Sequence, residues 1–207
     1  MKKPKSHYFS LWLIFIIIGI FVLQNLIPGL TSNFLLNQNS WQQPYRFITS
    51  ILLHSDVSHL FYNLLSLFFF GIILEKILGS KRFLAIFFLS GIIANLISIN
   101  FYTASLGASG AIFGIIGCLF ILRPKILVFA MGFPIPMYLA TIVWIIIDIF
   151  RTMMPTNVGT YAHFSGLGIG ILFGLYYYSR FKQKQKTKNP RIPEYYMMAW
   201  EKKYLGK

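Results

Sequence analysis

Cysteine, acidic residues and charge in general are scarce in this sequence of 207 residues. The single cysteine, Cys118, excludes an internal disulfide framework and a zinc site built from several cysteines. Only 12% of the residues are charged, whereas 56% are hydrophobic and the mean hydropathy is +0.63. This composition is typical of an integral membrane protein and excludes a soluble domain. No internal repeat stands out, so a transporter built from tandem halves is not indicated.

Long apolar segments dominate the sequence instead. They predict an all-α membrane protein with six spans, at 9–27, 58–78, 83–102, 109–122, 136–150 and 159–178. The polar and aromatic segment 30–57 is expected to form a structured loop at the membrane interface. Residues 79–82 are expected to form a short turn, and 126–136, which glycine and prolines interrupt, the lead-in to the fifth span.

The basic residues are distributed unevenly along these spans. All of them except Arg46 and Arg151 fall on segments that lie inside if the N-terminus is cytoplasmic. The positive-inside rule then predicts that both termini are cytoplasmic. We expect a cytoplasmic N-terminus at 1–8, a six-span domain at 9–180 and a basic tail at 181–207 that contacts anionic lipid. Because the net charge of +14 follows the topology, no nucleic-acid partner is expected.

The fourth apolar segment is too short to cross a bilayer. From Ser109 to Leu122 a helix rises about 21 Å, whereas the hydrocarbon core is about 30 Å thick. Since Arg123 follows and marks the cytoplasmic face, Ser109 is expected to lie about 9 Å below the outer face. The stretch Gly107-Ala108-Ser109-Gly110 therefore places a serine at the start of a helix inside the protein. This is a favourable position for a buried nucleophile.

Three other polar residues are predicted at the same depth as Ser109: His59, Asn63 and His163. Polar groups are costly in lipid, so their convergence indicates one shared cavity. Imidazole is the usual base that activates a serine hydroxyl, which makes His163 the candidate base. His59 and Asn63 share a helix face and can donate hydrogen bonds to a developing oxyanion. An interhelical hydrogen bond that only holds the spans together is the alternative for this pair.

Small residues line the two spans that carry Ser109 and His163. Such stripes let helix backbones approach closely in membranes. They are Gly107, Gly110, Gly114 and Gly117 on the fourth span and Gly166, Gly170 and Gly174 on the sixth. The stripes can bring Ser109 against His163, or they can be a packing motif without a catalytic role.

With these motifs the sequence resembles the rhomboid family of intramembrane serine proteases. The matching motifs are Gly107-Ala108-Ser109-Gly110, Ala162-His163-Phe164-Ser165-Gly166 and His59-Leu60-Phe61-Tyr62-Asn63. The resemblance implies a six-helix rhomboid bundle with a short central fourth helix that carries the nucleophile. It implies a catalytic dyad of Ser109 and His163 without an aspartate, and oxyanion stabilisation by His59, Asn63 and the Ser109 backbone.

The same resemblance implies that the protein needs no metal and no cofactor. The active site is expected to open to the extracytoplasmic side, and the substrates to be single-pass transmembrane proteins with small, helix-weakening residues near the outer face. Two departures from the family pattern are visible: Tyr45 precedes Arg46 where a tryptophan is common, and Phe113 stands where a tyrosine can stack on the base.

Other polar residues are given structural roles. Asp148 could orient a base, but Arg151 follows three residues later, so a local pair or a structural hydrogen bond is favoured. Glu75 is expected to anchor a turn, and His54 to serve the structure of the outer loop. Two alternatives to a protease are an inactive rhomboid-like protein that binds transmembrane clients, and a small-solute channel. The inner halves of the spans are almost wholly apolar, which disfavours the channel.

Overall fold

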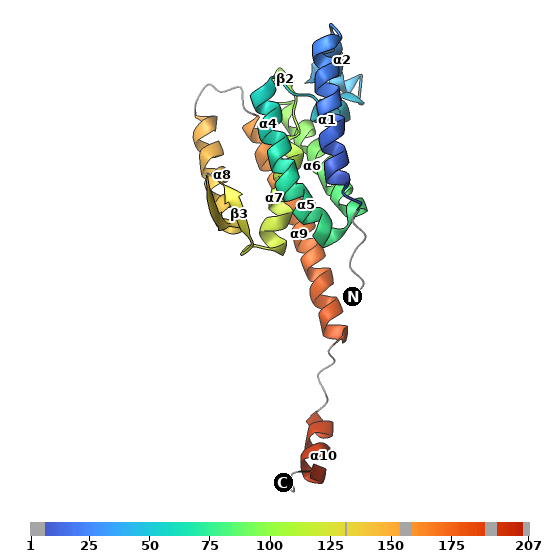
Figure 1. Ribbon diagram of the computed structural model, residues 1–207, viewed down its shortest axis with the longest axis vertical. Coiled ribbons are helices and arrows are strands. Elements are labelled where there is room, and N and C mark those ends of the chain that lie inside the picture. Colours follow the sequence, from blue (N-terminus) through green and yellow to red (C-terminus); the bar gives the residue numbers. More distant parts are fainter. Residues whose placement is uncertain (1–6, 131, 154–158, 189–193, 205–207) are drawn as a thin grey trace. The chain divides into compact units, whose positions relative to one another are not determined.

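The computed structural model describes residues 7–130, 132–153, 159–188 and 194–204. The elements run in the order α1 (Phe9–Leu26), α2 (Leu30–Phe34), β1 (Leu36–Asn37), η1 (Gln38–Trp41), α3 (Arg46–Thr49), η2 (Ser50–Leu52), α4 (Val57–Ser66), η3 (Leu67–Gly71), α5 (Ile72–Leu78), α6 (Ser80–Ser98), β2 (Ala104–Ser105), α7 (Ser109–Leu122), β3 (Leu127–Ala130), β4 (Phe133–Pro136), α8 (Met137–Thr152), α9 (Thr160–Lys188) and α10 (Glu194–Tyr204) (Figure 1).

The chain divides into two compact units, Met1–Leu175 and Tyr176–Lys207. The first unit holds the elements from α1 to α8 and the beginning of α9, and the second holds the rest of α9 together with α10. The predicted division into 1–8, 9–180 and 181–207 stays a prediction. The mostly helical architecture agrees with the expected fold class.

Within the described residues, three helical segments are long and apolar enough to cross a membrane: Phe9–Leu26, Val57–Leu78 and Ser80–Ser98. The second of these is α4, a π-helical turn η3 and α5 in one continuous run. α7 is apolar but shorter, with 14 residues, as the sequence indicated. The count of six spans therefore stays a prediction.

The connection before α6 is shorter than expected. Residues 79–82 do not form a turn; Gly79 alone makes it, with φ 87°, and α6 begins at Ser80. Because glycine carries no Cβ, it enters this left-handed region without strain, and the helix starts at the next residue. The amide of Phe83 already donates to the Gly79 carbonyl at 3.1 Å.

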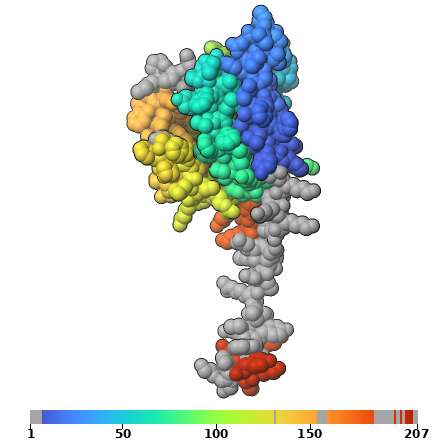
Figure 2. Space-filling view, viewed as in Figure 1, coloured from blue at the N-terminus to red at the C-terminus, as the bar shows by residue number. Residues whose placement is uncertain are grey.

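The segment 126–136 is not a plain lead-in to the fifth span. It forms a two-stranded antiparallel hairpin, β3 and β4, that turns at Gly132 with φ 84°. Val128 and Ala130 are buried, whereas Leu127 and Phe129 are exposed, which is the alternation of a strand with one packed face. The hairpin lies on the surface in Figure 2, where it is coloured yellow.

The loop between α1 and α4 is structured, and a buried arginine, Arg46, holds it together. Arg46 is 5% exposed, and its Nη1 donates to the carbonyls of Ser32 and Leu35, both at 2.9 Å. Its Nε donates to Gln43 Oε1 at 2.6 Å. These bonds satisfy backbone acceptors that would otherwise be unpaired inside the loop.

Glu75 joins the start of α1 to the turn between α5 and α6. Its carboxylate is fully buried and accepts hydrogen bonds from the backbone amides of Phe9 and Ser10 and from the hydroxyls of Ser10 and Ser80, at 2.6 to 2.9 Å. The first amides of a helix have no partner within the helix, so an acidic side chain there caps α1. Glu75 anchors more than the turn, because it also fixes the first helix.

Replacing Glu75 with alanine is expected to lower the free energy of unfolding by about 3 kcal/mol, because four donors, three of them in buried hydrogen bonds, lose a charged acceptor. Thermal unfolding of the purified protein in detergent measures this loss. Lys76→Ala is the matched control, since Lys76 is the next residue and is exposed. Equal unfolding temperatures for Glu75→Ala and Lys76→Ala would contradict the anchoring role.

Candidate functional site

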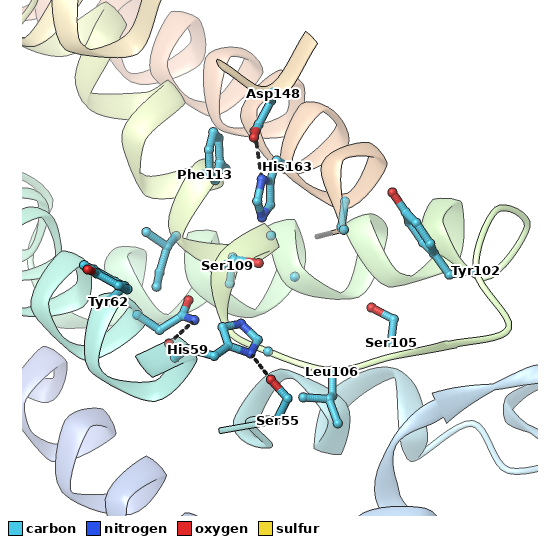
Figure 3. Close-up of a pocket in the computed structure, with 18 of the residues that line it drawn as sticks. Ser55, His59, Tyr62, Tyr102, Ser105, Leu106, Ser109, Phe113, Asp148 and His163 are labelled. Atoms are coloured by element: carbon cyan, nitrogen blue, oxygen red, sulfur yellow. Dashed lines mark hydrogen bonds and ion pairs between the residues drawn. The ribbon is translucent and has the colours of Figure 1, made fainter. Parts of the chain in front are cut away.

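A cavity of about 1080 Å³ contains all four residues singled out in the sequence. Ser109 reaches it from α7, His163 from α9, and His59 and Asn63 from α4. α8 adds Trp144, Ile147, Asp148 and Arg151, and the loop after α6 adds residues 101–107. Figure 3 shows Ser109 between His163 on one side and His59 on the other. The structure thus brings together side chains from three helices that are distant in sequence.

Ser109 is the first residue of α7, and its surroundings follow from that position. The backbone amides in the first turn of a helix point out of it without helical partners, and the helix dipole makes this end electropositive. The loop before it is pinned by a bond from the Gly107 amide to the Ser50 carbonyl at 2.9 Å. Gly107 has φ 126°, and a Cβ there would lie 2.8 Å from His59 Nε2. Only glycine allows both this conformation and the close approach of the His59 ring.

His163 is buried and is held from two directions. Its ring stacks on Phe113, with the centroids 4.3 Å apart and the planes 7° from parallel. Its Nδ1 lies 2.8 Å from Asp148 Oδ2. The other ring nitrogen faces Ser109 in Figure 3, although within the described residues no hydrogen bond joins the two side chains. The structure therefore places the Phe113 ring where the family resemblance suggested a stacking aromatic residue.

The family resemblance implied that no aspartate accompanies Ser109 and His163. The structure nevertheless places Asp148 in hydrogen-bond contact with His163. Asp148 is 1% exposed and contacts His163 as well as Arg151, whose Nη1 lies 3.3 Å from Oδ1. The local pair with Arg151 was predicted correctly, but it accounts for only one carboxylate oxygen. The spacing of α8 contained the missed signal: Met137, Ala140, Thr141 and Asp148 are all buried and lie on one helix face.

His59 and Asn63 lie at the start of α4, which Asp56 caps. Asp56 Oδ1 accepts from the His59 amide at 2.8 Å, and hydrogen bonds from Ser58, the His59 backbone and Ser55 lower the pKa of this carboxyl well below its usual range. The Ser55 hydroxyl lies 2.7 Å from Asp56 Oδ2 and 3.0 Å from His59 Nδ1. Because the single hydrogen of this hydroxyl is donated to Asp56, the hydroxyl accepts from His59 Nδ1, and Nε2 on the cavity side carries a hydrogen only when the ring is protonated.

Asn63 keeps part of its hydrogen-bonding capacity for the cavity. It is 6% exposed, and its Nδ2 donates to the His59 carbonyl at 2.8 Å. An amide nitrogen has two hydrogens, so one donor remains for a bound group. This bond within α4 also fixes the orientation of the Asn63 side chain.

The glycine stripes bring α7 and α9 into backbone contact. A methyl group on Gly166 would overlap the Gly110 carbonyl, and one on Gly170 would overlap the Gly114 carbonyl. Helices this close leave no room for any side chain at the crossing. Gly110 is the residue directly after Ser109, and Gly166 lies one helical turn after His163. The helix crossing at these glycines therefore sets the distance between the Ser109 and His163 side chains.

His54 packs against the site without entering the cavity. It is 1% exposed, its ring meets the His59 ring edge to face at 5.0 Å, and neither ring nitrogen has a hydrogen-bond partner within the described residues. Burial, with a smaller contribution from His59, lowers its pKa from 6.5 to about 4. This agrees with the structural role expected for His54.

The pKa of His54 predicts a loss of stability in mild acid. The unfolded chain binds a proton at His54 below pH 6.5, whereas the folded protein does so only near pH 4. Stability is therefore expected to fall by about 2 kcal/mol between about pH 7.5 and pH 5. In His54→Leu this part of the pH dependence disappears, which unfolding measurements at both pH values detect. The same pH dependence in both proteins would contradict the assignment.

The fold and the cavity define an integral membrane protein, mostly helical, with a serine and two histidines at one buried site. The rhomboid domain matches residues 41–180 of the chain. The chain therefore belongs to the rhomboid family.

Among its relatives, rhomboid protease GluP of Bacillus subtilis is 35% identical over 143 residues, which cover 67% of this chain and 26% of GluP. RHOMBOID-like protein 1 of Arabidopsis thaliana is 35% identical over 158 residues, 72% of this chain and 40% of that protein. A further relative, inactive RHOMBOID-like protein 8 of Arabidopsis thaliana, is 43% identical over 77 residues, 36% of this chain and 22% of that protein. The chain thus spans less than half the length of these relatives.

Proposed function

We propose that this protein is a serine endopeptidase that cleaves transmembrane segments of membrane proteins near the extracytoplasmic face. Family membership supports a protease, since several relatives are named rhomboid proteases. The observation that carries the proposal is the single cavity in which Ser109 lies at the start of α7 opposite a buried His163.

The proposed reaction uses Ser109 and His163 as nucleophile and base. Ser109 Oγ attacks a peptide carbonyl carbon while His163 Nε2 accepts the hydroxyl proton. The C–N bond of the substrate then breaks, and His163 returns the proton to the leaving amine. Water, deprotonated by His163, attacks the acyl-enzyme, and its hydrolysis restores the Ser109 hydroxyl. The cavity volume of about 1080 Å³ leaves room for both the peptide and the water.

The negative charge that develops on the carbonyl oxygen is stabilised by donors around Ser109. The Ser109 backbone amide, at the electropositive end of α7, is the first of these donors. In this proposal the set is completed by the second Asn63 hydrogen and by His59 Nε2, which donates when the ring carries hydrogens on both nitrogens. Gly107 supports it indirectly, because only its missing side chain lets the His59 ring approach.

The proposal includes the orientation of the protein and its partners. With both termini cytoplasmic, the cavity opens outward, and single-pass membrane proteins with small residues near the outer face are the substrates. A substrate segment enters between α4 and α8, because both helices line the cavity, α4 with Tyr62 and Ser66 and α8 with Trp144 and Ile147. The basic segment from 181 onward contacts anionic lipid.

A rhomboid-like protein without activity is the second candidate. One relative that covers 36% of this chain is named inactive, which shows that similarity alone does not establish catalysis. In that case the cavity would hold a transmembrane client without cutting it. The presence of both Ser109 and His163 in one cavity favours the protease.

The test is cleavage of a reporter by the purified protein in proteoliposomes. The reporter is a single-span protein with a Gly- and Ala-containing outer segment, and its control carries leucines there. We expect cleavage of the first reporter, slower cleavage of the second, and inhibition by a fluorophosphonate. Stable binding of the reporter without cleavage, together with no fluorophosphonate reaction, would support the inactive client-binding protein instead.

A further inference from the structure

Resting on the proposed function, we propose that Asp148 is a positioning residue for His163, so that the site works as a Ser109–His163–Asp148 chain rather than as a dyad. Asp148 Oδ2 lies 2.8 Å from His163 Nδ1, on the side of the ring away from Ser109. Its task is to hold the ring orientation and to keep the proton on Nδ1. The three side chains come from α7, α9 and α8, three separate helices.

The charge of Asp148 decides which atom of the pair donates. An ionised carboxylate can only accept hydrogen bonds, so the shared hydrogen at 2.8 Å belongs to His163 Nδ1. Arg151 Nη1 lies 3.3 Å from the other oxygen and places a positive charge beside the carboxylate. A neutral imidazole with its hydrogen on Nδ1 has a bare Nε2, which is the nitrogen that must accept the proton from Ser109.

Burial makes this arrangement costly unless both oxygens of Asp148 are paired. The side chain of Asp148 is 1% exposed, and a buried carboxylate without partners is strongly destabilising. Arg151, at 45% side-chain exposure, provides one partner from the same helix. His163 provides the other, and it becomes a cation once it has accepted the Ser109 proton. The carboxylate therefore stabilises the imidazolium formed during the reaction.

Phe113 and Asp148 together leave the His163 ring a single orientation. The stack on Phe113, with the planes 7° apart, fixes the plane of the ring. The bond to Asp148 selects one of the two ring orientations that share this plane, because a half-turn about the Cβ–Cγ bond would move Nδ1 away from the carboxylate. The stack on Phe113 is the same for both of these ring orientations, so Asp148 is needed to select the one with Nδ1 toward the carboxylate.

The most direct test is the tautomer of His163 in the wild-type protein. The protein with ¹⁵N-labelled histidine is examined by NMR in lipid at about pH 8, where an unperturbed histidine is neutral. The chain has four histidines, and the His163 signals are assigned by their loss in His163→Ala. We expect the proton on Nδ1. A proton on Nε2 of the wild-type ring would overturn the proposal without any further variant.

Kinetics of Asp148→Asn provide the second test. With Oδ1 of the new amide accepting from Arg151, its NH₂ group faces His163 Nδ1 and selects the tautomer with the proton on Nε2. We expect kcat to fall at least about 100-fold, with KM changed less than about threefold. A general loss of structure would instead lower the fraction of active protein and the unfolding temperature. A kcat within threefold of wild type would contradict the positioning role.

Arg151→Gln is the matched control, because it removes the other partner of the same carboxylate. We expect it to lower kcat less than about tenfold, since His163 keeps its acceptor. An equal loss in Arg151→Gln and Asp148→Asn would show that only the pair within α8 matters, and would overturn the proposal. Failure of this proposal can be distinguished from failure of the proposed function. A wild-type protein that neither cleaves the reporter nor reacts with a fluorophosphonate contradicts the protease activity itself.

Discussion

Ser109→Ala is expected to lower reporter cleavage at least about 10⁴-fold, and His163→Ala to lower it as much. Without the hydroxyl no acyl-enzyme forms, and without the imidazole nothing in the cavity takes the hydroxyl proton. Because the two residues act as one unit, the double variant is expected to be no slower than either single variant. Turnover of the purified variants in proteoliposomes measures all three rates.

Ser165→Ala is the matched control for these two variants. Ser165 lies two residues after His163 on α9, and its hydroxyl donates to the carbonyls of Tyr161 and Ala162 within the helix. Its loss is expected to change the cleavage rate less than about threefold, since the hydroxyl has no part in the site. Residual cleavage by Ser109→Ala above about 1% of the wild-type rate would contradict Ser109 as the nucleophile.

Gly166→Ala is expected to reduce cleavage at least about 100-fold, although Gly166 has no functional group. A methyl group there overlaps the carbonyl of Gly110, the residue after Ser109. α7 and α9 must then separate, and a displacement of about 1 Å at a catalytic group costs about 100-fold in rate. The same overpacking is expected to lower the free energy of unfolding by about 1–3 kcal/mol.

Gly168→Ala separates the close approach from any general effect of alanine on α9. A methyl group on Gly168 meets no atom within 4 Å. Because alanine also favours the helix, this variant is expected to keep both its cleavage rate and its unfolding temperature. Comparable activity of the two variants would mean that the contact between Gly166 and Gly110 does not set the geometry of the site.

The approach of the four polar side chains could be predicted from the sequence because few positions in an apolar segment are polar. The polar residues that stand out against nonpolar neighbours are Ser109, His163, His59 and Asn63. Because exposing polar groups to lipid is costly, they are expected to face a common cavity. The glycines at regular spacing then indicated which helices touch. The start of α7 at Ser109 and its end at Leu122 were predicted to the residue, because glycines and Arg123 bound this segment.

Asp148 shows where the sequence argument ended. The sequence allowed Asp148 to orient a base, but it favoured a local pair because Arg151 lies one helical turn away. The rotation of α8 about its axis decides whether the carboxylate also faces inward, and rotation depends on packing that involves several helices at once. The buried face that begins at Met137 and Ala140 continues to Asp148, and this periodicity was the available signal.

Turn geometry accounts for the remaining differences. Gly79 completes the turn before α6 alone, and Gly132 closes a hairpin where an irregular lead-in was expected. In both places a positive φ at a single glycine reverses the chain within fewer residues than its composition suggested. A segment with Pro134 and Pro136 was not expected to form a strand, but prolines are compatible with an edge strand.

The measurement that tests the central claim most directly is the site of fluorophosphonate attachment in the wild-type protein. The protein in lipid is treated with the reagent, digested and analysed by mass spectrometry, and His163→Ala is treated alongside. The account predicts a single adduct on Ser109 that forms at least about 100-fold more slowly in His163→Ala. An adduct on another residue, or equal labelling of Ser109 in both proteins, would contradict a serine activated by His163.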